Sequence, residues 1–103
     1  MIKVIVNKSD GKVKSLSLKG HANYDVSGKD IVCASVSSIA ITTINAIISL
    51  EEEAIYYEER GSSLIIKINN DNPIALKLID NMIRMLKEIE EDYPKNIVIR
   101  NEE

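Results

Sequence analysis

Short segments rich in aliphatic and β-branched residues come in two pairs along the chain. The first pair covers residues 2–6 and 13–19, and the second covers residues 54–60 and 64–68. In residues 13–19 the leucines alternate with serines and a lysine, which is the period of a strand with one buried and one solvent-facing side. A short turn that contains a glycine separates the members of each pair. The pattern therefore predicts two β-hairpins.

Two longer segments carry helical signals. Residues 31–50 form an uncharged run, and Asp30 directly before it is a suitable N-cap, which places Cys33 at the third helical position. The second helix is predicted to begin after Asn72, a cap residue that is followed by a proline. Apolar residues then recur at helical spacing until a Tyr-Pro pair ends the helix.

The predicted order of elements is strand, strand, helix, strand, strand, helix, strand, and the last strand is residues 97–99. This order, ββαββαβ, indicates an α+β fold. Two β-hairpins and a C-terminal strand form a mostly antiparallel sheet, which is packed with two helices. The length of 103 residues supports a single domain over residues 1–103.

Residues 31–50 also have the length of a membrane-spanning helix. The run contains seven serine, threonine and asparagine side chains, which are too many polar groups for a helix in lipid. We expect no membrane association, and a helix that is buried on most sides by protein. One sheet and one further helix are too small to bury this apolar helix completely. We therefore expect a homodimer that covers its remaining apolar surface.

The composition narrows the class of protein. Hydrophobic residues make up 45% of the chain, which is typical of a globular protein, and the absence of Phe and Trp leaves the core to aliphatic residues and methionine. The net charge is −3, the sequence contains no basic stripe, and only tyrosine offers a stacking face for bases. These features argue against direct nucleic-acid binding.

The chain has one cysteine and one histidine. A single cysteine forms no internal disulfide, which fits a reducing compartment, and the first residues lack the zones of a signal peptide. We therefore expect a cytoplasmic protein. One histidine and one cysteine are too few ligands for a zinc site, even with Asp25 and Asp30, so no metal and no cofactor are expected.

His21 and Cys33 lie twelve positions apart, on either side of a polar loop. The histidine follows the end of a predicted strand, and the cysteine lies in the first turn of a predicted helix. This layout suits a nucleophilic pair in which the imidazole activates the thiol. A helix N-terminus alone stabilises an anion by about 0.3–1 kcal/mol, so the imidazole has to lie beside the sulfur. On residue type alone, a lone cysteine in an apolar segment is more often a small core residue.

Several neighbours of this pair are candidates for supporting roles. Asp30 can cap the helix or can orient the His21 ring as the third member of a triad, and Asp25 is a second candidate for the orienting role. The backbone N–H groups of Cys33 and Ala34 are candidates for binding an oxyanion.

The loop over residues 22–29 is long enough to close over a ligand, although its simpler role is to join a strand to a helix. Gly20 before the loop and Gly28 within it are candidate positions for loop movement, because a glycine has no side chain to obstruct it.

Taken together, Gly20-His21-Ala22, Asp30-Ile31-Val32-Cys33-Ala34 and Ser37 resemble the signature of the bacterial ribosomal-processing cysteine protease Prp family. The resemblance covers the whole chain, including the loop with Gly28, although residues 23–27 are particular to this sequence. It implies an α+β homodimer that cleaves an N-terminal extension, with aromatic residues just before the cut, from large-subunit ribosomal protein twenty-seven. By the same resemblance Cys33 corresponds to the nucleophile and His21 to the general base.

A non-catalytic module that binds a peptide or a ribosomal protein remains the alternative. In that case Cys33 is a core residue and His21 is a polar group at the end of a strand. The two hypotheses differ in whether the thiol reacts readily with an alkylating agent at neutral pH, and in whether a bound peptide is cut.

Overall fold

A computed structural model describes residues 1–26 and 29–103, and it has the predicted order of elements. The α+β fold expected from the sequence is confirmed, and most predicted element boundaries lie within a few residues of those observed. The elements are β1 (Ile2–Ser9), β2 (Lys12–Lys19), α1 (Ile31–Leu50), β3 (Ile55–Arg60), β4 (Ser63–Ile68), α2 (Pro73–Asp92) and β5 (Ile97–Glu102).

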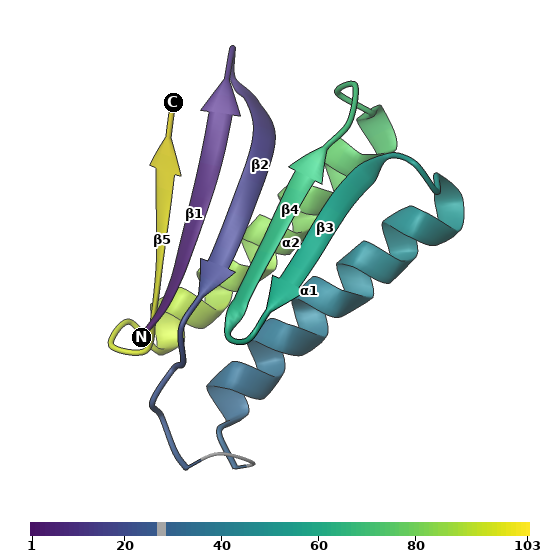
Figure 1. Cartoon of the computed structure of the whole chain (residues 1–103). Helices are drawn as coiled ribbons and strands as arrows, with labels where there is room; N and C mark the ends of the chain where they lie inside the picture. The colour runs from purple at the N-terminus through teal and green to yellow at the C-terminus, as the bar shows by residue number, and fades with distance from the viewer. Residues whose placement is uncertain (27–28) are drawn as a thin grey trace.

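All five strands join one sheet in the order β3-β4-β2-β1-β5 (Figure 1). The two hairpins are antiparallel and are joined edge to edge through β2 and β4. β5 pairs in parallel with β1, with Ile97 opposite Ile2, so the last strand lies beside the first. The sheet is therefore mostly antiparallel, as predicted, with one parallel pair at an edge.

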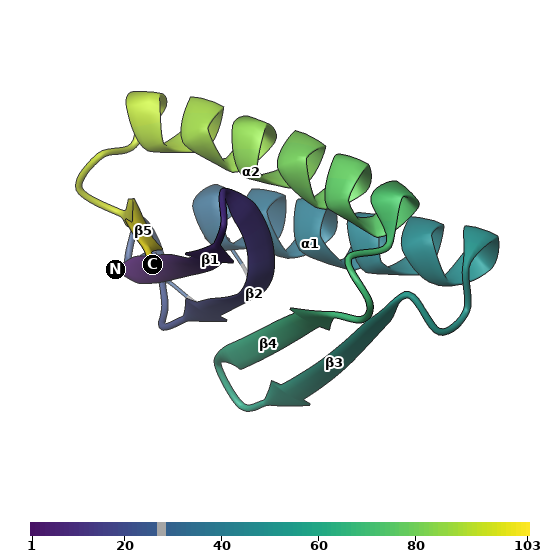
Figure 2. The ribbon, with the colours of Figure 1, turned by 90° about the horizontal axis from the view of Figure 1, so that it is seen from above.

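Both helices cover the same face of the sheet, and the other face is left uncovered (Figure 2). The covered face presents every second strand residue, among them Val4, Val6 and Ile66, which are fully buried. From α2, Ile79 and Leu86 complete the same core. One layer of helices on one layer of sheet thus accounts for the alternation of apolar and polar residues in the strands.

Both helices begin where the cap residues predicted. The Asp30 side chain accepts hydrogen bonds from the backbone N–H groups of Val32 and Cys33, each at 3.0 Å. Asn72 caps α2 in the same way, and Pro73 is its first helical residue. Cys33 is consequently the third residue of α1, which confirms the predicted position.

The prediction that α1 is buried on most sides is wrong for the single chain. The buried residues of α1 form one stripe that faces the sheet and α2: Val32, Val36, Ala40, Ile44 and Ile47. Ile31, Ile41 and Leu50 are 52%, 44% and 63% exposed, because none of the other described elements covers that side. Of the helices described, α1 alone is long and apolar enough to cross a membrane by length and composition.

Candidate active site

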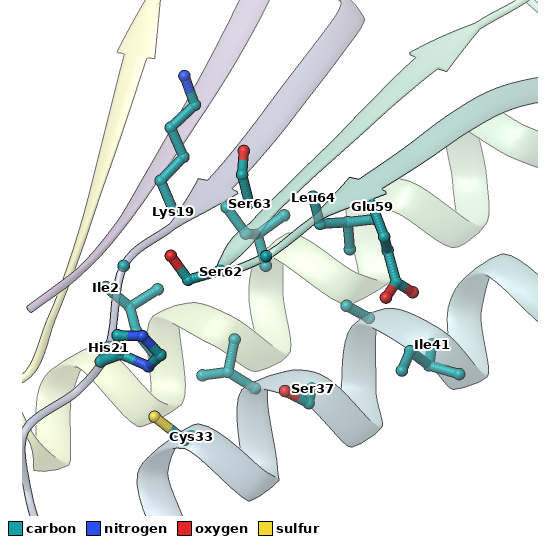
Figure 3. Close-up of a pocket in the computed structure, with 15 residues that line it drawn as sticks. Ile2, Lys19, His21, Cys33, Ser37, Ile41, Glu59, Ser62, Ser63 and Leu64 are labelled. Atoms are coloured by element: carbon teal, nitrogen blue, oxygen red, sulfur yellow. The ribbon is translucent and has the colours of Figure 1, made fainter.

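His21 and Cys33 belong to different segments of the chain, and both line one pocket. The pocket has a volume of about 250 Å³ and lies between the N-terminal half of α1, the end of β2 and the turn that joins β3 to β4 (Figure 3). His21 follows β2 directly after Gly20, and Cys33 enters from the first turn of α1. The histidine is exposed and the cysteine is half-buried. A ligand in the pocket would therefore meet both side chains.

The sulfur of Cys33 points from α1 toward the imidazole of His21 (Figure 3). The backbone N–H of Ala22, the next residue after His21, donates a hydrogen bond to the Cys33 sulfur over 3.2 Å. This contact joins the end of β2 to the start of α1 at the thiol itself. An N–H donor aimed at the sulfur, at the positive end of a helix, favours negative charge there.

The Asp30 carboxylate joins the start of α1 to the preceding loop. Its Oδ1 accepts from the amides of Val32 and Cys33, and its Oδ2 accepts from the amides of Tyr24 at 2.9 Å and Asp25 at 3.2 Å. The hydrogen bond from the Cys33 amide is the main cause that lowers the pKa of this carboxyl. Desolvation opposes it, and the weaker effects of the other three amides lower the pKa further. All four donors are backbone groups, so this geometry is that of a helix cap and a loop clamp.

The other proposed orienting acid also bonds locally. Asp25 Oδ1 accepts from the N–H of the following residue, Val26, at 2.7 Å. Within residues 1–26 and 29–103, no hydrogen bond joins either carboxylate to the ring of His21. The role of an acid in orienting His21 therefore stays a prediction.

The amides predicted to bind an oxyanion are already occupied. The Cys33 N–H donates to Asp30 Oδ1, and the Ala34 N–H donates to the Asp30 carbonyl at 3.1 Å. Both bonds belong to the capped first turn, so the structure does not present these N–H groups to a substrate. A carboxylate that caps the helix uses donors that an oxyanion would need, so the oxyanion role of these two amides stays a prediction. The Ala22 amide is the N–H that points at the sulfur.

The position of Gly20 requires a glycine, because the Gly20 backbone lies close to the backbone of Met1. Its φ is +97°, and a Cβ added there would lie 2.6 Å from the carbonyl oxygen of Met1. Its own N–H donates to the Ser62 carbonyl at 3.0 Å, which ties the end of β2 to the β3–β4 turn. A role of Gly20 in loop movement stays a prediction, and Gly28 lies outside the described residues.

The C-terminal turn before β5 holds the loop that carries the site. Asn96 donates from its side-chain amide to the Ala22 carbonyl at 3.0 Å, and the ring of Tyr24 packs edge-on against Tyr93 with centroids 5.3 Å apart. Sequence reasoning missed these contacts, because nothing local marks a residue that bonds across 74 positions of chain.

From the sequence, Ser37 was named only as part of the family signature, and the other residues of two pocket walls were not identified. Ser37 and Ile41 extend the wall that begins at Cys33, and their spacing of four residues is a helical signal for a shared face. Glu59 and Ser62 form the opposite wall, and only the tertiary fold brings the β3–β4 hairpin there. Among the described residues, no three His, Cys, Asp or Glu side chains are grouped so that they could hold a metal ion.

The chain resembles known proteins over nearly its full length. Residues 1–98 match the family described as cysteine protease Prp. The sequence is 37% identical to the ribosomal processing cysteine protease Prp of Staphylococcus aureus over 101 residues, covering 94% of this chain and 95% of that protein. It is 32% identical to the Bacillus subtilis protein of the same name over 108 residues, with 94% of each chain covered.

The fold is similar to that of a solved relative. A crystal structure of an essential ribosomal processing protease Prp from S. aureus, in complex with a covalently linked product peptide, matches with a TM-score of 0.91 and 35% identity. The match covers 99% of this chain and all of that chain. A second S. aureus Prp structure, in complex with a substrate peptide, matches with a TM-score of 0.88 and 32% identity. In sequence and in fold, this protein belongs to the cysteine protease Prp family.

Proposed function

We propose that this protein is a cysteine endopeptidase in which Cys33 is the nucleophile and His21 the general base. We further propose that it removes the N-terminal extension of large-subunit ribosomal protein twenty-seven, and that it does so as a cytoplasmic homodimer. The observation that carries the proposal is the meeting of the chain's one cysteine and one histidine in a single pocket of a Prp-family fold.

The chemistry requires one proton carrier and one nucleophile. His21 takes the proton from the thiol, and the Cys33 sulfur attacks the scissile carbonyl carbon to form a C–S bond and an oxyanion. As the oxyanion collapses, the C–N bond breaks and the imidazolium gives its proton to the leaving amine. His21 then takes a proton from water, the hydroxide attacks the thioester, and the C–S bond breaks to release the acid and restore the thiol. The Ala22 N–H and the start of α1 stabilise the negative charge near the sulfur.

The shape and lining of the pocket suit a peptide. Apolar side chains, including Ile2, Leu18 and Val36, lie beneath it, and polar groups such as Ser37 and Ser62 lie along its walls. Pockets with this mixture hold a ligand by apolar contact and orient it through a few polar groups. The two S. aureus structures contain a covalently linked product peptide and a substrate peptide. An extended chain with an aromatic side chain next to the scissile bond is the substrate we expect here.

The exposed side of α1 supports the proposed dimer. Ile31, Ile41 and Leu50 are large apolar side chains that this chain leaves uncovered. Burying such a surface against a second copy would remove it from water. Light scattering at increasing concentration tests this proposal, and a monomer throughout would contradict it.

The direct test uses a synthetic peptide that spans the extension and the first residues of the mature ribosomal protein from the same organism. We expect the unmodified protein to cut it at one bond, as measured by mass spectrometry. Cys33→Ala should cut no faster than the buffer blank. His21→Ala should lower kcat/KM by about a hundredfold to ten-thousandfold, the usual contribution of a general base.

The matched control is Ser38→Ala, because Ser38 lies on the same helix and does not line the pocket. Its cleavage rate should equal that of the unmodified protein. Equal cleavage by Cys33→Ala would end the peptidase hypothesis. Peptide binding without any cleavage by the unmodified protein would favour the binding-module alternative.

A further inference from the structure

The helices leave one face of the sheet uncovered (Figure 2). The composition of this face is unlike that of the rest of the chain. Strand register assigns to this open face every second residue, each opposite a residue of the neighbouring strand. Up to the register shift between Asn7 and Lys8, the open face consists of Lys3, Ile5, Asn7, Ser15, Ser17, Lys19, Tyr56, Glu58, Arg60, Ser63, Ile65, Lys67, Val98, Arg100 and Glu102.

The open face is basic in an acidic protein. Five of its residues are Lys or Arg and two are Glu, so it carries a net charge of +3, while the whole chain carries −3. All five cationic side chains belong to exposed residues. One of them, Arg60, forms an ion pair with Glu58 at 2.6 Å. Each of the five strands contributes one basic residue to the open face defined here, and Lys12, opposite Ser9, lies beyond the register shift.

Two of these lysines face each other. Lys3 on β1 is paired with Lys19 on β2, and the row that they form continues through Ser63 to Arg60 without an acidic residue. Like charges placed directly opposite on neighbouring strands destabilise a sheet. A bound anion between them removes that repulsion, so this row is where an anionic ligand would be held most strongly.

The acidic residues elsewhere do not cancel this charge. Many of them lie on α2 and in the turn after α1, on the helical side of the sheet. The Cα trace is 22 Å across its shortest extent, and the Debye length in 0.1 M salt is about 10 Å. Charges on the far side of the molecule are therefore largely screened from a ligand on the open face.

We propose that the open face is a binding surface for RNA. Neighbouring strands are about 4.8 Å apart, so basic residues on five strands are spread over a width of roughly 19 Å, which suits a chain of phosphates rather than a single anion. The hydroxyls of Ser15, Ser17 and Ser63 can donate to phosphate oxygens between the cations. At the edge, the Tyr56 residue is 52% exposed and offers a ring on which a base can stack.

This inference runs against the expectation, drawn from the sequence, of no direct nucleic-acid binding. The sequence contains no basic stripe because the five cations are separated along the chain and come together only through strand pairing. The surface is distinct from the pocket of His21 and Cys33, which opens between α1 and the sheet, although Lys19 and Ser63 border both. RNA binding and the proposed peptidase activity can thus be tested separately.

The test measures the fluorescence anisotropy of a fluorescein-labelled, 20-nucleotide single-stranded RNA of mixed sequence, titrated with the full chain in 50 to 300 mM KCl. The triple variant Lys3→Gln, Lys67→Gln, Arg100→Gln removes three open-face charges that do not line the pocket. Three lost phosphate contacts should make the slope of log K against log salt shallower by about 2. We expect binding at least tenfold weaker in 50 mM KCl.

The matched control is Lys77→Gln, Arg84→Gln, Lys87→Gln, which removes the same residue types from the exposed side of α2. The control should bind the RNA within twofold of the unmodified protein. Both triple variants should keep the circular dichroism spectrum and the peptide cleavage rate of the unmodified protein, so a failure of the peptidase proposal would not be mistaken for a failure of this one.

Three results would overturn the proposal. The first is no salt-dependent binding of the RNA by the unmodified protein. The second is equal loss of binding in both triple variants, which would mean that only net charge matters. The third is a change of oligomeric state in the open-face variant together with unchanged RNA affinity, which would assign this face to contact between two copies of the chain.

Discussion

Replacing Gly20 with alanine should distort the site without changing either of the side chains proposed to react, His21 and Cys33. The new Cβ would lie 2.6 Å from the Met1 carbonyl oxygen, well inside van der Waals contact, and the backbone φ of +97° is unfavourable for any residue with a side chain. An unfavourable φ of this kind costs roughly 1–2 kcal/mol, and overpacking costs roughly 1–3 kcal/mol. Relief requires moving Met1, but Ile2 beside it donates its N–H to the Asn96 carbonyl at 2.9 Å.

We therefore expect Gly20→Ala to lower the free energy of unfolding by about 2–5 kcal/mol in urea titrations. For a chain of this length, this corresponds to a fall in Tm of at least about 8 °C. Gly11→Ala and Gly61→Ala are the controls, because both glycines have positive φ and nothing lies within 4 Å of their added Cβ atoms. They should lose only about 1–2 kcal/mol, the backbone part of the effect.

The same variant has a consequence for activity, since Gly20 directly precedes His21 and bonds to the Ser62 carbonyl. Cleavage of the extension peptide should fall in Gly20→Ala at temperatures where the variant is still folded, and it should be unchanged in Gly11→Ala. A Gly20→Ala protein as stable as Gly11→Ala would refute the reasoning, because it would show that the close approach to Met1 imposes no constraint.

Three further outcomes are expected. The Cys33 amide and other backbone donors lower the pKa of Asp30, so its stabilising effect is complete above the ordinary aspartate pKa of about 3.9 and is lost as pH falls through the lower pKa of the folded state. Asp30→Asn should thus be less stable than the unmodified protein at pH 7, and urea titrations should show the gap narrowing toward pH 2. Asn96→Ala should lose about 1 kcal/mol of stability in urea and lower kcat/KM for the extension peptide, because the loop carbonyl loses its donor. Met82→Ala should cost about 2–5 kcal/mol in the same titration, since the side chain is fully buried, whereas Met85→Ala, at 39% exposure, should cost under about 1 kcal/mol.

Each of these outcomes has a clear contrary. A constant gap between Asp30→Asn and the unmodified protein over the whole pH range would mean that the carboxylate charge plays no part. Unchanged turnover in Asn96→Ala would show that the hydrogen bond from the C-terminal turn to the loop has no effect on catalysis. Equal losses in the two methionine variants would contradict the assignment of α2's buried face.

The starts of both helices were predictable because their signals are local. Asp30 and Asn72 cap helices through amides two and three residues away, and Pro73 is tolerated only at a helix start. His21 and Cys33 were identifiable because the chain has one of each, and the spacing of strand and helix brought them to the same end of the sheet.

Features that depend on distant partners were not predictable. The strand at residues 97–99 reads the same whether it pairs in parallel or antiparallel, and it continues to Glu102 through polar residues. The uniform composition of α1 does not say which side meets the sheet, so its exposed side was predicted as buried. The oxyanion role of the Cys33 and Ala34 amides stays a prediction, and the sequence did not indicate that the Asp30 cap accepts from the Cys33 amide as well as from Val32.

Because β5 pairs with β1, the sheet and the site depend on a segment that is synthesised after both site residues. β1 is synthesised before the other strands described and its parallel partner β5 after them, and Asn96, which donates to the Ala22 carbonyl, directly precedes β5. A nascent chain that still lacks its final residues carries both the imidazole and the thiol without the contact that positions the loop between them. The loop between the two site residues is therefore held by this contact only after the turn before β5 has been synthesised.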